Sequence, residues 1–467
     1  MALLFFISVS KKIQTYLTEN NITPRKDAGP GVWLTFLLPL SIILGELTNK
    51  NTSHTYKTVA CISCGLFVHT IIFLAQVNKN IFFSATTLII PCSLSALMLF
   101  YLTNEGVLLS ILYGISAIAA YHASIFPLMK LFPRNFTYGE STVTAQSLVL
   151  FLISSFIRNP LGSASCMDTS TIIVQFGILW VMGIGAAAYH FNWKRKPKPF
   201  YSSVLLTMIF ILLLPLYFLI GESPITWILS LIIKDNTLQI LVCYWSICSL
   251  LGVLTIYLQI KKGNKATTVV RKTFHLLTVL VFAPGIILRP CFLFLASGVI
   301  FGIFIAIDML RILQIPPLGS ILQTGYIKFA DEKDEGPLAL TPLYLLVGCS
   351  LPLWIHPDPE RSELLPLISG LLSVGIGDTA ASACGSLVGK NKWPGSKKTK
   401  EGSAACFLSQ LFLVIALIHF GYIPRTNLIK PTFAIALVSI VEAKTDQIDN
   451  LAMPLLMYVM TIWKWKY

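Results

Sequence analysis

Long apolar runs alternate with short polar segments along the whole chain. A membrane-spanning helix needs about 20 mainly apolar residues, and runs near that length predict about fifteen spanning helices, within a range of about 13 to 17. The runs are 32–47, 58–77, 81–102, 106–128, 142–157, 171–192, 201–220, 239–259, 274–288, 290–310, 338–357, 363–384, 403–420, 431–442 and 451–463. The pattern predicts an all-α polytopic membrane bundle without internal repeats, with a further interfacial piece at 225–233.

The composition agrees with this pattern. Hydrophobic residues make up 55% of the 467 residues and charged residues only 12%, whereas a soluble domain carries about 25% charged residues. The mean hydropathy of +0.74 also excludes a disordered chain, which needs low hydrophobicity. Residues 1–257 hold few ionisable side chains within their apolar runs and are predicted to be a scaffold or lipid-contacting half, while 258–467 carries the chemistry.

The positive charge fits a membrane protein better than a nucleic-acid-binding one. The chain has 35 Lys and Arg against 21 Asp and Glu, a formal net charge of +14. Its basic clusters stand in the loops 194–198, 261–272 and 390–400, and threading the predicted spans puts all three on one side. Basic loops of membrane proteins face the cytosol, which accounts for the positive charge, so we expect no nucleic-acid partner. The same threading puts the acidic segments near 331–336 and 442–450 on this cytosolic face.

The densest polar segment begins inside a predicted span. Asp378, Ser382, Gly385 and Gly389 are spaced four, three and four residues apart, which places them on one helix face. An acid within a span indicates a functional site. The glycines by themselves fit helix packing through small residues as well as they fit close approach to a phosphate.

The loop that follows strengthens the phosphate interpretation. It offers a stiff turn, an aromatic ring, backbone donors and two adjacent cations, as polyphosphate binding requires. These features come from Trp393, Pro394, Gly395, Lys397, Lys398 and Thr399, followed by Glu401 and Gly402. The loop is not a Walker A motif, and its lysines alone would be typical of any cytosolic loop.

Two further acidic segments are predicted on the same side. Four acids in 329–337, Asp331 and Asp334 among them, suit a hard cation such as Mg²⁺, although a solvated charge run is an equal alternative. In 442–450, three acids recur at helical spacing and would repel one another unless they meet a cation. They are Glu442, Asp446 and Asp449.

A basic segment lies at the entrance of the span 274–288. His275 is either a base or, more commonly for a lone histidine at a helix start, a hydrogen-bonded structural residue. Arg271 and Lys272 fit phosphate binding, lipid headgroup binding or simple anchoring of the span.

Together these segments resemble the dolichol kinase family, the CTP-dependent polyprenol kinases of the endoplasmic reticulum. The resemblance covers about 260 to 455 in matching order and spacing, and its parts are shared with phytol kinases, CTP-dependent diacylglycerol kinases and, more distantly, CDP-diacylglycerol synthases. One departure is Asp308, where a Glu is expected. The motifs are 271–275, 331–336, 377–382, 393–402 and 442–451.

The resemblance implies transfer of the γ-phosphoryl group of CTP to dolichol, which gives the carrier lipid of protein glycosylation. The implied nucleotide-binding residues are Gly385, Gly389, Trp393, Pro394, Gly395, Lys397, Lys398, Thr399, Glu401 and Gly402, with Arg271, Lys272 and His275. The implied ligands of Mg²⁺, or another divalent cation, are Asp331, Asp334, Asp378 and Asp449. The catalytic base stays open among Asp378, Glu442 and Asp449.

Other functions remain alternatives. A kinase of another lipid alcohol, phytol or diacylglycerol, would share these motifs. A transporter would need ionisable residues at span centres and inverted repeats, whereas these polar segments gather at one interface. A non-catalytic scaffold would not need Asp378, Lys397, Lys398 and Glu401. The choice of CTP over ATP rests on the resemblance alone.

Overall fold

The computed structural model describes residues 2–49, 51–157, 165–191, 195–330, 334–424 and 428–463. The prediction of an all-α protein is confirmed, because these residues form helices and the β-pairing among them is one isolated bridge between Lys392 and Thr399. The acid Asp331, predicted to bind metal, lies outside the described residues.

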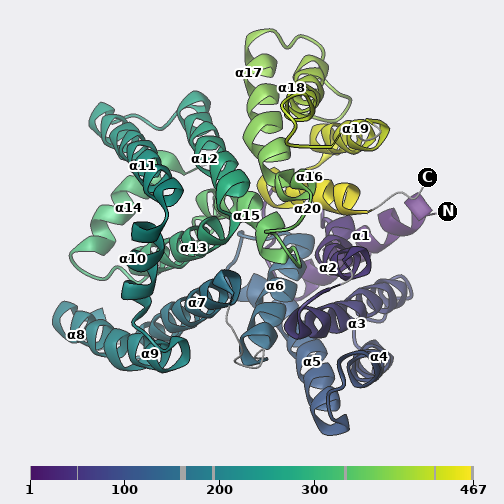
Figure 1. Ribbon diagram of the computed structural model, residues 1–467. Helices are drawn as coiled ribbons and strands as arrows, with labels where there is room; N and C mark the ends of the chain where they lie inside the picture. The colour runs from purple at the N-terminus through teal and green to yellow at the C-terminus, as the bar shows by residue number, and fades with distance from the viewer. Residues whose placement is uncertain are drawn as a thin grey trace.

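The helices follow one another with short connections (Figure 1). In chain order they are α1 (Ala2–Glu19), η1 (Val32–Phe36), α2 (Leu37–Thr48), α3 (His54–Val77), α4 (Thr86–Thr103), α5 (Val107–Leu131), α6 (Tyr138–Phe156), α7 (Cys166–His190), α8 (Pro197–Thr207), η3 (Met208–Leu213), α9 (Leu214–Ile220), α10 (Pro224–Lys234), α11 (Asn236–Lys262), α12 (Thr268–Leu288), α13 (Pro290–Ile312), α14 (Leu318–Phe329), α15 (Leu340–Ile355), α16 (Leu364–Leu367), η4 (Leu371–Asp378), α17 (Thr379–Leu387), α18 (Lys400–His419), α19 (Ile429–Lys444) and α20 (Asp449–Ile462).

Nine helical segments in the described part of the chain are long and apolar enough to cross a membrane, and four shorter apolar helices accompany them. The protein is therefore a polytopic membrane protein. Three of the expected spans are not among these nine segments. The span 142–157 corresponds to α6, and 431–442 corresponds to α19. The span 363–384 corresponds to the segment that runs from α16 through η4 to α17. α6 buries a polar face that includes Glu140 and Gln146, which explains how a less apolar helix packs inside the bundle.

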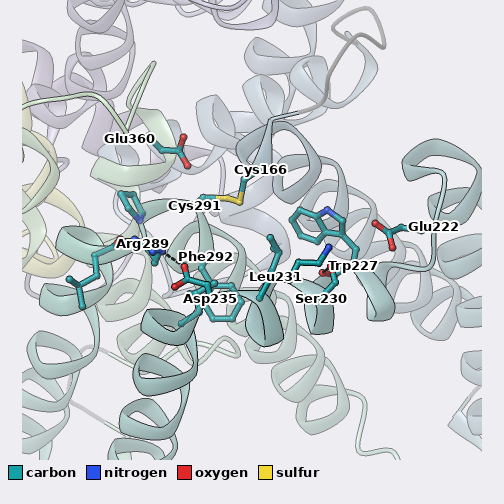
Figure 2. Close-up of a pocket in the computed structure, with 14 residues that line it drawn as sticks. Cys166, Glu222, Trp227, Ser230, Leu231, Asp235, Arg289, Cys291, Phe292 and Glu360 are labelled. Atoms are coloured by element: carbon teal, nitrogen blue, oxygen red, sulfur yellow. Dashed lines mark hydrogen bonds and ion pairs between the residues drawn. A yellow bond between two sulfur atoms is a disulfide. The ribbon is translucent and has the colours of Figure 1, made fainter.

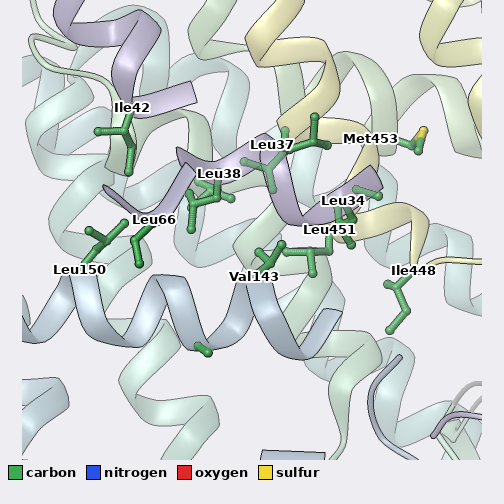
Figure 3. Close-up of a cluster of buried hydrophobic side chains, with 14 of the residues drawn as sticks. Leu34, Leu37, Leu38, Ile42, Leu66, Val143, Leu150, Ile448, Leu451 and Met453 are labelled. Atoms are coloured by element: carbon green, nitrogen blue, oxygen red, sulfur yellow. The ribbon is translucent and has the colours of Figure 1, made fainter. Parts of the chain in front are cut away.

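One hydrophobic core joins the first helices of the chain to the last. Leu38 of α2, Leu66 of α3, Val143 of α6 and Leu451 of α20 are buried in the same cluster (Figure 3). In Figure 1 the purple α2 lies beside the yellow α20, and these two helices are in direct contact. The N-terminal half therefore packs directly against helices that carry acidic residues of the C-terminal half.

A disulfide links the two halves at one end of the bundle. Cys166 at the start of α7 bonds to Cys291 at the start of α13 across 125 residues (Figure 2). It lies beside a cavity of about 610 Å³ at which the Arg289 Nε and Asp235 Oδ2 atoms are 2.5 Å apart. The spacing of single cysteines does not reveal their partners, so the sequence did not predict this bond. The other eight cysteines, from Cys61 to Cys406, are free.

Candidate functional site

Asp378 stands where the apolar segment from α16 to α17 departs from regular α-helix. It ends the π-helical segment η4, and such segments often occur at functional sites. A Cβ added to Gly375 would lie 2.4 Å from Val279 Cγ2, and one added to Gly377 would lie 2.5 Å from Gln410 Nε2. Because both glycines lack side chains, η4 approaches α12 and α18 closely enough to bring Asp378 against the start of α12.

Three carboxylates from separate helices converge at this point. Asp378 of η4, Glu442 of α19 and Asp449 of α20 each place one oxygen within 4.8 Å of the others. Asp378 and Glu442 are buried and Asp449 is half-buried. The three acids predicted as alternatives for the catalytic base thus belong to one cluster, which we call the acidic triad.

Basic side chains surround the acidic triad. Lys272 forms an ion pair with Asp378, and His275 Nε2 lies 3.4 Å from Asp378 Oδ2. Lys398 forms an ion pair with Glu442, donates to the Glu442 carbonyl oxygen over 2.7 Å, and lies 4.0 Å from Asp449 Oδ2. Positive charges on both sides therefore offset the repulsion among the acids.

The electrostatic environment keeps Lys398 positively charged. Burial by itself would lower the pKa of this ammonium group, but the carboxylates of Asp449 and Glu442 outweigh burial and raise it above its ordinary value. Lys398 therefore remains a fixed cation over the physiological pH range, as the phosphate-binding role predicted for it requires.

The predicted nucleotide loop forms a hairpin that projects beside the triad. Trp393 N donates to the Lys398 carbonyl oxygen over 3.0 Å, and Gly395 takes a positive φ of 73° at the turn. The indole Nε1 of Trp393 donates to Ser403 Oγ over 2.9 Å. Trp393 is thus held against the first turn of α18, and Lys400 and Lys444 lie over its ring.

Thr399 and Glu401 hold the base of this hairpin. Thr399 Oγ1 accepts a hydrogen bond from Gly402 N and caps α18. The Glu401 carboxylate accepts hydrogen bonds from the backbone and side chain of Asn391. The two residues fix the loop that presents Lys398, while Pro394 and Lys397 are exposed.

The predicted glycines sit in tight packing between α17 and α18. A Cβ on Gly402 would lie 2.8 Å from the Ala381 carbonyl oxygen, and one on Gly389 would lie 2.3 Å from the Gly385 carbonyl oxygen. Close helix packing, one of the two interpretations of these glycines, explains why no larger residue fits there. Phosphate binding by the glycines stays a prediction.

The remaining predicted residues lie around the triad or apart from it. Arg271 stands one turn before His275, whose Nδ1 atom lies 3.3 Å from the Arg271 carbonyl oxygen. Asp334 is not in the triad: its Oδ1 atom accepts a hydrogen bond from Thr341 N at the start of α15. Asp446 is exposed.

Sequence reasoning missed the N-terminal residues that touch the acidic segments. A buried ion pair between Arg25 and Glu140 contacts the 445–448 loop, and the Asn135 amide pairs with both backbone groups of Leu338. One sequence feature could have pointed to these residues. Thr137 and Glu140 match the capping-box pattern of a helix start, and they form that capping box at the start of α6.

The arrangement is suited to binding a divalent cation together with a polyphosphate. Carboxylate oxygens from three helices provide hard ligands, and Lys272 and Lys398 provide positive charge beside them. The 393–402 loop, tied to the triad through Lys398, brings the exposed lysines Lys397 and Lys400 to the same end of the bundle.

Comparison with known proteins identifies relatives of this chain. A sequence model of the family described as Dolichol kinase matches residues 51–395. Human dolichol kinase is 33% identical over 357 residues, which cover 71% of this chain and 66% of the relative. Dolichol kinase EVAN of Arabidopsis thaliana is 26% identical over 491 residues, covering 92% and 85%. Dolichol kinase of Saccharomyces cerevisiae is 26% identical over 353 residues, covering 70% and 66%.

The human relative is matched over 66% of its own length. No solved structure matches the chain. Because the family model covers most of the sequence and the human protein is one-third identical over the matched region, this chain belongs to the dolichol kinase family.

Proposed function

We propose that this protein transfers the γ-phosphoryl group of CTP to the hydroxyl of dolichol and produces dolichyl phosphate for protein glycosylation. The observation that carries the proposal is the acidic triad, flanked by Lys272 and Lys398 at one end of a membrane bundle. Membership of the dolichol kinase family supports the lipid substrate. The proposal of CTP as donor rests on the resemblance of the 393–402 loop to the nucleotide loop of that family.

The chain's own residues account for the requirements of phosphoryl transfer, which are mainly positioning and charge neutralisation. Lys397 and Lys398 would bind the triphosphate, and Lys272, paired with Asp378, would hold that carboxylate in position. Mg²⁺ bound by Asp378 and Asp449, with Glu442 alongside, would neutralise phosphate charge. Asp334 stays a predicted ligand that has another contact in this structure.

In the transfer step the dolichol hydroxyl oxygen bonds to the γ-phosphorus, and the bond from that phosphorus to the β–γ bridging oxygen breaks. CDP leaves, and the hydroxyl proton passes to a carboxylate of the acidic triad. The polyprenyl chain would lie among the apolar helices, with its hydroxyl at the cytosolic interface of the endoplasmic reticulum membrane.

The experiment uses purified full-length protein in detergent with Mg²⁺. We would compare γ-labelled CTP with ATP, and dolichol with phytol and diacylglycerol. We expect label in dolichyl phosphate from CTP, and its loss in Asp378→Asn. The matched control Asp235→Asn, which alters an acid at the disulfide end of the bundle, should retain transfer. Label in phytol or diacylglycerol alone, or from ATP alone, would contradict the substrate assignment.

A further inference from the structure

The loop that precedes Asp449 is held by the N-terminal half of the chain. Arg25 Nη2 donates to the Asp446 carbonyl oxygen over 2.9 Å, and Ile448 N donates to Glu140 Oε1 over 2.9 Å. Asp446 and Ile448 lie close before Asp449, which begins α20. Backbone groups on the approach to a triad acid are therefore fixed by side chains more than 300 positions away in the sequence.

Arg25 and Glu140 are themselves paired away from solvent. Arg25 Nη2 lies 2.7 Å from Glu140 Oε1, Arg25 Nε donates to Oε2 over 3.3 Å, and the two side chains are 5% and 0% exposed. Such a two-point pair fixes direction as well as distance. Glu140 Oε2 also accepts from Thr137 N over 2.9 Å, which ties the pair to the start of α6.

Gln447 adds side-chain contacts to the same N-terminal loops. Thr137 Oγ1 donates to Gln447 Oε1 over 2.6 Å, and Gln447 Nε2 donates to the Gly29 carbonyl oxygen over 2.9 Å. A Cβ on Gly31 would lie 2.2 Å from Gln447 Oε1. The two hydrogen bonds therefore connect the 445–448 loop to the N-terminal loops at Gly29 and Thr137.

The same loops also hold the other acidic segment. Asn135 Nδ2 donates to the Leu338 carbonyl oxygen over 3.0 Å, and Leu338 N donates to Asn135 Oδ1 over 3.1 Å. Lys26 Nζ lies 3.0 Å from Glu335 Oε2. The acidic segments 334–338 and 445–449 are thus both in contact with residues 25–31 and 135–140. These residues belong to the N-terminal half, which the sequence analysis predicted to be a scaffold.

We infer that Arg25 and Glu140, together with Thr137, are positioning residues that set the place of Asp449 in the acidic triad and hence its affinity for a divalent cation. They act through the 445–448 loop and do not touch the triad. The inference rests on the proposed function, because it assumes that the acidic triad binds the metal ion used in phosphoryl transfer.

The test measures metal binding directly. Full-length protein in detergent is titrated with Mn²⁺, used as the probe, and free Mn²⁺ is followed by electron paramagnetic resonance. Loss of a residue that orients a metal ligand weakens affinity about 10- to 100-fold. We expect Glu140→Gln to raise the Mn²⁺ Kd by about tenfold, to raise the half-saturating Mg²⁺ concentration for transfer by a similar factor, and to leave the KM for the lipid alcohol unchanged.

A second pair of variants keeps the test decisive if Glu140→Gln does not fold. Thr137→Val removes the hydroxyl that reaches Gln447 and should weaken Mn²⁺ binding, while Thr137→Ser keeps the hydroxyl and should restore it. The matched control is Tyr56→Phe. It deletes a partly buried hydrogen bond between the same two halves, from Tyr56 Oη to the Ile355 carbonyl oxygen over 2.9 Å, at the other end of α15 from Asp334.

Unchanged Mn²⁺ affinity in folded Glu140→Gln or Thr137→Val protein, or an equal loss in Tyr56→Phe, would overturn the inference. So would failure of the unaltered protein to bind Mn²⁺. If the unaltered protein transfers no phosphate to dolichol but Glu140→Gln still weakens Mn²⁺ binding, the proposed function fails and the positioning role stands.

Discussion

At the scale of single residues, the site is a set of mostly buried acids, each of which lies close to at least one basic side chain. Asp378 is paired with Lys272 and approached by His275, and Glu442 is paired with Lys398. An isolated buried charge is strongly unfavourable, and removal of one partner leaves the other uncompensated. Substitutions here should therefore affect the arrangement of the acids as well as the charge that a phosphate meets.

Lys272→Met should lower the rate of phosphoryl transfer by about a hundredfold, the upper end of the loss expected when a residue that orients a metal ligand is removed. Lys272→Arg should retain more of the rate because it keeps the positive charge. Initial rates with labelled CTP and dolichol would measure this. The matched control is Lys328→Met, since Lys328 donates to the Ile260 carbonyl oxygen and should be replaceable. A similar loss in both Met variants would contradict a specific role for Lys272.

The pH dependence of stability provides a separate test of Lys398. Its pKa is raised by Asp449 and Glu442 against the opposing effect of burial. A raised pKa means that the folded state favours the protonated form, so the stabilisation is fully present below the ordinary lysine pKa and is lost only as pH rises through the raised value. The difference in melting temperature between the unaltered protein and Lys398→Met should therefore stay constant from about pH 7 to pH 9. A difference that shrinks within this interval would show that Lys398 is not held as a cation.

At the scale of helices, close backbone approach decides where the acids meet. Gly348 of α15 lies against the first turn of α20, and a Cβ there would lie 1.9 Å from the Asn450 carbonyl oxygen and 3.1 Å from Pro454 Cγ. The neighbouring backbone would have to move, and Asn450 directly follows Asp449. Packing between α15 and α20 is thus coupled to the geometry of the acidic triad.

Gly348→Ala should destabilise the protein by about 1–3 kcal/mol through overpacking and should lower the transfer rate. Gly183→Ala is the control in α7, because nothing lies within 4 Å of the added Cβ and alanine favours a helix over glycine by about 1 kcal/mol. Thermal unfolding in detergent and initial rates would report both effects. Equal behaviour of the two variants would exclude the coupling.

At the scale of the whole molecule, the site and the disulfide lie at opposite ends of the bundle. Lys272 stands in the first turns of α12, and Cys291 follows the end of the same helix. The 21 residues of α12 span about 30 Å. Disulfides persist in oxidising compartments such as the lumen of the endoplasmic reticulum, so the disulfide end is expected in the lumen and the triad at the cytosolic face.

Accessibility in sealed vesicles derived from the endoplasmic reticulum would test this orientation. Lys390→Cys, in the exposed part of the hairpin, should react with a membrane-impermeant maleimide added outside. Glu222→Cys, exposed at the cavity beside the disulfide (Figure 2), should react only after the vesicles are permeabilised. The unaltered protein reports the background from its free cysteines. The reverse pattern would place the site in the lumen.

The sequence determined the helical membrane class and the segments that hold the chemistry. Long apolar runs with little charge leave no other stable fold in lipid. Asp378 could be singled out because an acid within an apolar span is costly unless it functions. Glu442 and Asp449 were indicated by acids at helical spacing that need a cation, and Lys398 by the composition of its loop. Local features of the 393–402 hairpin also followed from its Pro, Gly and Trp residues.

Other features were decided only by the tertiary structure. Glu442, which the resemblance did not include among the metal ligands, joins the triad because α19 and α20 meet η4. Asp334 contacts the start of α15 instead, and Cys166 finds Cys291 because α7 packs along α13. The contacts of Arg25 and Glu140 with the 445–448 loop join residues hundreds of positions apart. Apolar periodicity records which face of a helix is buried, but the partner of that face depends on the packing of all the helices together.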